Sequence, residues 1–454
     1  MATSSLSVIG SGLDIPSLVS QLVAAERKPA ADRINNDGTA ATAQLSALGT
    51  IKSSLSSLQS ALNTLTKSAD TLAFKTSVPD GSGFSATVVT DPTSGKTKAA
   101  AGTYNVEVLS LANPQKLTSG AFAADEVVGD LGAITIAWGD QSINVPTGVG
   151  NTLSDLAKAI NTVANGKGVN ATVITANDGQ HLVLNAVNAG TDGALTVSTT
   201  GGDGSRLNEL SWDGASGGLS QTVAATNARV RVDGFERESS SNSISDLIPG
   251  ITLNLAKAAE GTTTTLTVSQ DNSPLKINLQ AFVAAYNASI NLLTSSSAYD
   301  SKTNTASALT GDSLVRGLQQ QLRSQLSANV IDMKALGLTI NTDGTMAFSS
   351  STFDKAMAGN PNAAASLLGS KGKLGSSLST ILQSNLDSST GTLSMRTDSL
   401  NKQIKKLEKD LDDLDARMDQ VSARYTAQFT AMDSLVAQMQ STSNYLSQQL
   451  GSLK

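Results

Sequence analysis

The sequence predicts an α+β, multidomain protein in which helical, coiled-coil termini enclose nested β-rich domains. Near both ends of the 454-residue chain, apolar residues recur at spacings of three and four, the heptad pattern of helices that pack side by side. In the middle the apolar period changes to two, as in half-buried strands, and after residue 273 helical spacing returns. We therefore expect the chain to run outward along an N-terminal helix, form the β-rich domains at the far end, and run back along C-terminal helices that pack against the first.

The nested order divides the chain into five expected parts. They are an N-terminal leg helix (1–45), a helical-bundle domain with a small hairpin (46–77 and 273–380), a β-rich plate domain (78–125 and 223–272), an inserted β-rich distal domain (126–222) and a C-terminal coiled-coil leg (381–454).

The first helix is expected to start at Asp14, since Asp is a favoured N-cap and Pro16 suits the first turn. Pro29 is expected to end or bend this helix. A heptad seam then runs from Leu48 to Leu72 between Ser, Thr, Lys and Gln residues, so one stripe is buried and the rest faces water. Its candidate assembly residues are Leu48, Ile51, Leu55, Leu58, Leu62 and Leu65.

Strands are predicted where apolar and polar residues alternate, at residues 103–108, 229–233 and 251–255. Turn signals between candidate strands are Asn177-Asp178-Gly179, Asp233-Gly234 and Glu260-Gly261, as hairpins require. Thr152 and Asp155 form a capping box that predicts one helix within the β-rich region. The stretches 186–206 and 214–219, rich in Gly, Ser and Asn, indicate surface loops or domain edges.

Helices return after Pro274, with apolar faces at 282–293 and 314–326. A short hairpin is expected around Asn341-Thr342-Asp343-Gly344. The C-terminal seam runs from Leu393 to Leu446 in one heptad register and needs a partner along its length. Its candidate assembly residues are Leu400, Ile404, Leu407, Leu411, Leu414, Met418, Val421, Tyr425, Met432 and Leu435. The dense charges at 402–419 lie off this seam and are interpreted as a solvated flank.

Composition excludes several classes of function. Charged residues are 15% and aromatic residues 3% of the chain, and the net charge is −6, so no basic surface for nucleic acid is expected. The absence of cysteine excludes disulfides, thiol nucleophiles and Cys-ligated metals. The N-terminus lacks the pattern of a cleaved signal peptide, and no stretch approaches the about 18 apolar residues of a membrane span. We expect neither membrane insertion nor export through a cleaved signal.

A search for catalytic chemistry predicts no enzyme, cofactor or metal site. Gly10-Ser11-Gly12 lacks the strand and the motif of a phosphate loop, and Asn341-x-Asp343-Gly344 lacks the later ligands of a calcium loop. The single histidine, His181, is most simply an exposed strand residue. For Trp138 and Trp212, core packing is favoured over surface anchoring.

Several blocks resemble the bacterial flagellar filament cap family, flagellar hook-associated protein 2. They are GLDIPSLVSQLVAAERKP at 12–29, GTYNVEVLSLA at 102–112 with QKL at 115–117, VDG at 232–234, DLIPGITL at 246–253, LTGDS at 309–313, and LGL at 336–338 with DGT at 343–345. Residues 152–197 are similar to a small module inserted in many flagellins and hook-associated proteins. The resemblance covers nearly the whole chain.

This resemblance implies a closed homo-oligomeric ring at the extracellular tip of the flagellum, which keeps exported flagellin in place while flagellin folds and polymerises. The implied partners are a second copy of the chain, flagellin, the flagellar type III export apparatus and a dedicated export chaperone. Two alternatives stay open: a flagellin or hook–filament junction subunit, and a tip adhesin whose 126–222 module binds a host surface glycan. An enzyme hidden in the β-rich region is a remote third.

Overall fold

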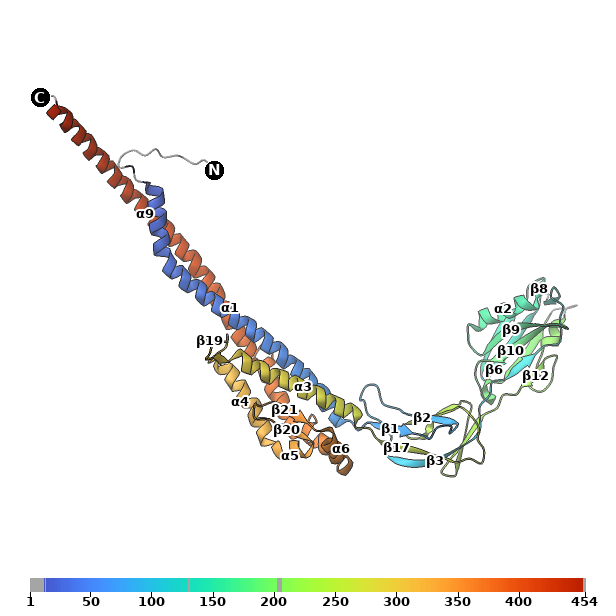
Figure 1. Ribbon diagram of the computed structural model, residues 1–454. Helices are drawn as coiled ribbons and strands as arrows, with labels where there is room; N and C mark the ends of the chain where they lie inside the picture. The colour runs from blue at the N-terminus through green and yellow to red at the C-terminus, as the bar shows by residue number, and fades with distance from the viewer. Residues whose placement is uncertain (1–11, 13, 130, 202–205, 452–454) are drawn as a thin grey trace. The chain divides into compact units, whose positions relative to one another are not determined.

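The computed structural model describes residues 12, 14–129, 131–201 and 206–451. It consists of two compact units, a helical one built from the described residues up to Asp70 and from Leu275 onward, and a β-rich one, Thr71–Pro274. Figure 1 shows the helical chain ends and the β-rich elements that lie between them in the sequence. The predicted α+β class with helical termini enclosing β-rich domains is confirmed.

Two long helices dominate the helical unit, α1 (Ile15–Asp70) and α9 (Thr392–Gly451). They run antiparallel, because Lys52 lies beside Ser394 whereas Glu26 lies beside Tyr425. Helix α1 continues through Pro29, so the expectation that Pro29 could end it is wrong. A proline removes one backbone donor, and packing along the rest of α1 outweighs that loss.

Shorter helices and two hairpins complete this unit. They are α3 (Ser273–Ser296), β18 (Tyr299–Asp300) with β19 (Thr305–Ala306), α4 (Ser313–Ala328), α5 (Val330–Ala335), β20 (Leu338–Ile340) with β21 (Met346–Phe348), α6 (Ser350–Gly359), α7 (Ala363–Leu368) and α8 (Lys373–Leu386). The expected hairpin around residue 341 is confirmed. Helices α5 to α8 were not predicted individually, since short helices show little periodicity.

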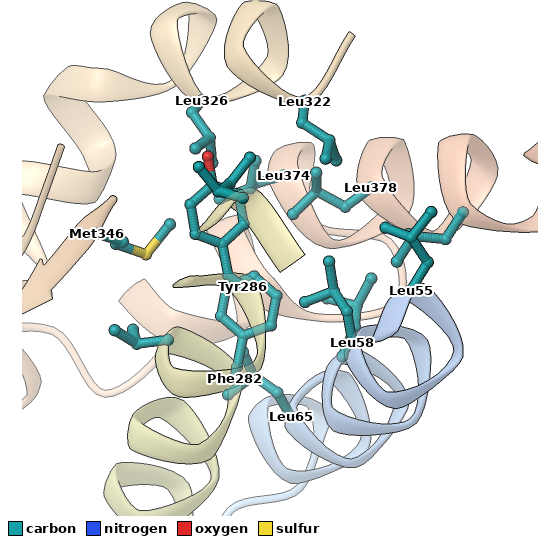
Figure 2. Packing of buried hydrophobic residues seen from close by; sticks show 14 of the residues in the cluster. Leu55, Leu58, Leu65, Phe282, Tyr286, Leu322, Leu326, Met346, Leu374 and Leu378 are labelled. Atoms are coloured by element: carbon teal, nitrogen blue, oxygen red, sulfur yellow. The ribbon is translucent and has the colours of Figure 1, made fainter. Parts of the chain in front are cut away.

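The apolar core of the helical unit lies where α1, α3, α4 and α8 meet. Figure 2 shows Leu55, Leu58 and Leu65 of α1 facing Phe282 and Tyr286 of α3 across this core. The hydroxyl of Tyr286 donates a 3.1 Å hydrogen bond to the carbonyl of Gly344. Burial raises the pKa of Tyr286 to about 12, so the hydroxyl stays protonated and keeps this bond.

The β-rich unit contains two sheets that share one core. The first has the order β1-β17-β3-β13-β14 and the second β15-β16-β2. Their bounds are β1 Phe74–Ser77, β2 Phe84–Val88, β3 Gly102–Ser110, β13 Ala228–Val232, β14 Phe235–Ser239, β15 Ser243–Ile248, β16 Ile251–Leu255 and β17 Thr264–Gln270. All three strand predictions are confirmed. The turn at Asp233-Gly234 joins paired strands, but Glu260-Gly261 does not, because β16 and β17 belong to different sheets.

The inserted segment, together with β4, forms a separate core of its own, built around the sheets β12-β4-β10-β9 and β11-β6-β7 and the pair β5-β8. The elements are β4 Lys116–Thr118, β5 Val127–Gly129, β6 Ala133–Trp138, β7 Gln141–Pro146, β8 Asn151–Thr152, α2 Leu153–Ala164, β9 Val169–Ala176, β10 Gly179–Ala186, η1 Thr191–Gly193, β11 Leu195–Thr200, η2 Arg206–Leu210 and β12 Ser220–Val223. The capping box of Thr152 and Asp155 is confirmed.

Residues 186–206 correct an expectation in this segment. The described part of that stretch contains β11, with Leu195 and Val197 buried, so it is more than a surface loop. Trp138 and Trp212 are both buried, which confirms the core interpretation.

Gly168 is a packing position against Trp138. A Cβ at Gly168 would lie 2.1 Å from Cε2 of Trp138, whereas a Cβ at Gly166 would meet nothing within 4 Å, although both glycines have φ above +70°. We expect Gly168→Ala to lower the free energy of unfolding by about 1–3 kcal/mol more than Gly166→Ala, because only the former overpacks the core. Urea unfolding followed by tryptophan fluorescence measures this difference, and equal losses would contradict it.

Candidate assembly site on the paired terminal helices

The α1–α9 pair has a small apolar core of its own beyond the main bundle. Ala31 of α1 packs with Leu414, Met418 and Val421 of α9, all less than 10% exposed. Half-buried side chains around them include Ile34 and Tyr425. The heptad spacing of the α9 residues places them on one face, as the sequence predicted.

Polar contacts fix the register of the two helices. Nε of Arg27 donates to Oδ1 of Asp415 at 2.6 Å, and the hydroxyl of Tyr425 donates to Oε2 of Glu26 at 3.2 Å. The hydrogen bond from Arg27 holds the pKa of Asp415 below its usual range. Both side chains are substantially exposed, so the pair specifies alignment more than it stabilises.

A groove opens between α1 and α9 on the bundle side of that core. Its volume is about 570 Å³. Ile404, Leu407 and Leu411 of α9 line it on one side. Opposite them, α1 offers Ile34 at one end and mostly small side chains along the rest, at Gly38 and Thr42 among others. Helix α1 therefore does not fill the space, and these three α9 residues are only half-buried.

The C-terminal end of α9 carries a second uncovered apolar surface. Its apolar residues at heptad spacing are Met432 (43% exposed), Leu435 (56%), Met439 (65%) and Leu446 (54%). We call these four residues the terminal stripe. No charged side chain lies between residues 434 and 451.

The structure places the predicted assembly residues in three different environments. Those fully enclosed by the main core of the helical unit are Leu48, Ile51, Leu55, Leu58, Leu62, Leu65 and Leu400. Those that pack in the α1–α9 pair or line its groove are Ile404, Leu407, Leu411, Leu414, Met418, Val421 and Tyr425. Met432 and Leu435 are exposed. Leu72 lies beyond the end of α1 and is 41% exposed.

The first group packs within its own chain, so an assembly role between subunits stays a prediction for the other two. The groove was missed by sequence reasoning. The sequence feature that could have indicated the groove is the run of small residues at 38–43, which faces leucine and isoleucine residues of the C-terminal seam.

The charged flank of α9 is solvated. Lys406 pairs with Asp410 and Lys409 with Asp413, each at 2.7 Å and four residues apart. All four side chains are at least 38% exposed. This arrangement supports the interpretation of residues 402–419 as a solvated flank, with the exception of Asp415, which pairs with Arg27 of α1.

Within the described residues, no group of three or more His, Asp or Glu side chains is arranged to hold a metal ion. None of the helices described combines the length and the apolar character that a membrane span requires. Gly10 and Ser11, weighed as a phosphate loop, lie outside the described residues. The loop at Asn341 is the turn of the β20–β21 hairpin, where Asp343 accepts hydrogen bonds from Thr345.

His181 is a structural contact and not a freely exposed residue, which corrects the sequence expectation. Its Nδ1 lies 3.0 Å from the carbonyl of Ser119 and its Nε2 lies 3.1 Å from Oδ1 of Asp178, with the side chain only 19% exposed. Both neighbours are acceptors, so only the protonated ring can donate to both. The carbonyl of Ser119 and then Asp178 raise the pKa of His181.

This arrangement predicts a pH-dependent stability. A raised folded-state pKa gives stabilisation that is fully present below the unfolded pKa of about 6.5 and is lost as pH rises through the folded value. We expect His181→Gln to lower the melting temperature of the β-rich unit more at pH 5.5 than at pH 8.5, measured by tryptophan fluorescence. A pH-independent difference would contradict the assignment.

Known proteins match this chain over nearly its full length. The models for the flagellar hook-associated protein 2 N-terminus and C-terminus match residues 11–115 and 225–441. The flagellar hook-associated protein 2 of Escherichia coli K12 is 33% identical, with 99% of this chain and 98% of that protein aligned. The chain belongs to the flagellar hook-associated protein 2 family. The predicted resemblance is thereby confirmed.

Further similarities agree with this membership. The B-type flagellar hook-associated protein 2 of Pseudomonas aeruginosa is 30% identical over 97% of this chain and 96% of that protein. The crystal structure of the D1-D2-D3 domains of the flagellar cap protein FliD from Escherichia coli has a TM-score of 0.63 at 30% identity, covering 78% of this chain and 99% of that one. The predicted filament cap role is supported, and the flagellin, junction and adhesin alternatives are not favoured.

The inserted segment has a separate match. The flagellin hook IN motif matches residues 133–188, so this module begins and ends earlier than the expected 152–197. The matched range extends from β6 to just past β10 and includes α2.

Proposed function

We propose that this protein is a subunit of the cap at the distal, extracellular end of the bacterial flagellar filament, where it oligomerises and promotes the folding and polymerisation of exported flagellin. The observation that carries the proposal is the pair of terminal helices, which leaves an apolar groove and a terminal stripe uncovered in a chain that matches cap proteins along its length. Uncovered heptad surfaces on a long helix favour association with further helices.

The role we propose is structural, with no catalytic step. Copies of the chain form a closed ring, and flagellin is the main heterologous partner. The part of α9 beyond residue 433 carries no charged side chain around its stripe, and such a surface favours weak, exchangeable contacts as each flagellin subunit is added. The five-part division given above is our proposed domain map, with 78–125 and 223–272 as the plate, except that β4 and Phe122 pack in the core of the distal domain.

The proposal also includes the route by which the chain reaches the filament tip. A chain without cysteine suits passage through a narrow type III channel, and a dedicated export chaperone is the further partner that this route implies. A host glycan on residues 126–222 is a separate proposal, which deletion of that module followed by attachment and motility assays would test.

Complementation tests the proposed function. In a motile bacterium whose own cap gene is deleted, expression of this chain should restore filaments and reduce the flagellin lost to the medium. Electron microscopy of the cells and immunoblotting of the medium measure both outcomes. Continued loss of flagellin, with the chain itself exported and folded, would contradict a cap function.

A further inference from the structure

The groove between α1 and α9 has the form of a docking surface for a third helix. Its walls are Ile404, Leu407 and Leu411 on one side and Ile34, Gly38 and Thr42 on the other. The three α9 residues follow the 3,4 spacing of a heptad seam. A helix that lies in the groove can therefore pack its own heptad residues between these side chains. The groove extends on α1 from Ile34 to Ser46, which is about 18 Å of helix.

The terminal stripe matches that groove in spacing, length and charge. Met432, Leu435, Met439 and Leu446 follow the same heptad register and extend over about 21 Å of helix. Asp433, next to Met432, is the one charged residue within the range of the stripe, and from residue 434 to residue 451 the helix carries no charged side chain. Most of the stripe therefore brings no ion into the apolar floor. The preceding seam residues Leu414, Met418 and Val421 already pack against α1, so they are not available to enter a groove.

One chain cannot make this contact with itself. Helix α9 is continuous from Thr392 to Gly451, so Leu407 and Leu435 are held about 42 Å apart along it. The stripe of one copy therefore reaches only the groove of another copy. Two different surfaces meet in such a contact, and heterologous contacts of this kind close into rings when the rotation between subunits permits.

We propose that the terminal stripe of one subunit docks in the α1–α9 groove of the next, and that this contact links neighbouring copies of the chain. The proposal deepens the cap function proposed above, because it names a surface by which the subunits of the ring associate. The contact itself is a property of the purified protein and is tested without flagellin or cells.

Single-cysteine variants test the contact directly, because the chain contains no native cysteine. Thr39→Cys places a thiol at the exposed edge of the groove and Leu435→Cys places one in the stripe. Asn444→Cys is the matched control, since it is exposed on the opposite face of the same end of α9. Each variant is purified alone. The Thr39→Cys variant is then mixed with either the Leu435→Cys or the Asn444→Cys variant, and each mixture is treated with a short bismaleimide.

We expect the Thr39→Cys and Leu435→Cys mixture to give a cross-linked dimer at least tenfold more abundantly than the Thr39→Cys and Asn444→Cys mixture. Equal yields, or no dimer in either mixture at concentrations where sedimentation shows self-association, would overturn the proposal. Protection of the Thr39→Cys thiol only when purified flagellin is added would assign the groove to flagellin and would also overturn it.

A groove-filling variant gives an independent readout. Gly38→Leu adds a side chain where a Cβ would meet nothing within 4 Å, so the chain should remain folded while the groove is occupied. We expect sedimentation velocity to show weaker self-association for Gly38→Leu, and unchanged association with unchanged helical content would count against the contact. Cross-linking that fails while complementation succeeds would reject this contact and leave the cap function standing.

Discussion

Replacing Leu407, Leu411 and Leu414 together with aspartate abolishes filament growth while the β-rich unit stays folded; this is the result we expect. Leu414 is 3% exposed in the α1–α9 core, and an unpaired carboxylate cannot be buried there without a large cost. Leu407 and Leu411 line the adjoining groove. The three changes therefore separate the paired helices and remove the groove in one step.

Electron microscopy of cells and the amount of flagellin in the medium measure this outcome. Both tryptophans, Trp138 and Trp212, lie in the β-rich unit, so tryptophan fluorescence reports whether that unit remains folded. Lys409→Ala with Asp413→Ala is the matched control, because this solvated pair lies on the same helix. Normal filaments from the triple variant would rule out an assembly role for this surface.

The second large effect concerns the core of the helical unit. Phe282 has no exposed surface and packs against Tyr286, with ring centroids 6.4 Å apart. We expect Phe282→Ala to lower the free energy of unfolding of the helical unit by about 3–5 kcal/mol, the range for truncating a buried aromatic side chain. Urea unfolding followed by circular dichroism at 222 nm measures this loss.

Ile277→Ala is the control for that experiment, since Ile277 lies on the same helix but is 63% exposed. Its removal should change stability by less than about 0.5 kcal/mol. If both variants lost equal stability, Phe282 would not be the packing centre that its burial indicates.

Local patterns in the sequence predicted most of the elements. The heptad spacing from Leu48 to Leu65 predicted a buried face, and each of those residues is at most 1% exposed. The capping box at Thr152 predicted the start of α2. These features depend on residues within one or two turns of each other, so the sequence carries them directly.

The errors arose where distant segments decide the outcome. Pro29 lies within a helix that packs along α9, and tertiary packing outweighs the local signal to stop. Glu260-Gly261 has the composition of a hairpin turn, but the pairing of β17 with β1 and β3 places the following strand in another sheet. The surroundings of His181 required Ser119, 62 residues earlier in the chain.

The assembly surface shows the same division. By itself the sequence determined that both chain ends are long amphipathic helices, that the charges of 402–419 lie off the seam, and that catalytic residues are scarce. Only the tertiary structure decided which part of each seam is already occupied. Leu48 and Leu400 are enclosed within one chain, whereas Leu407 and Leu435 remain accessible. A heptad pattern specifies that a face must be covered, but the segment that covers it depends on packing between residues hundreds of positions apart.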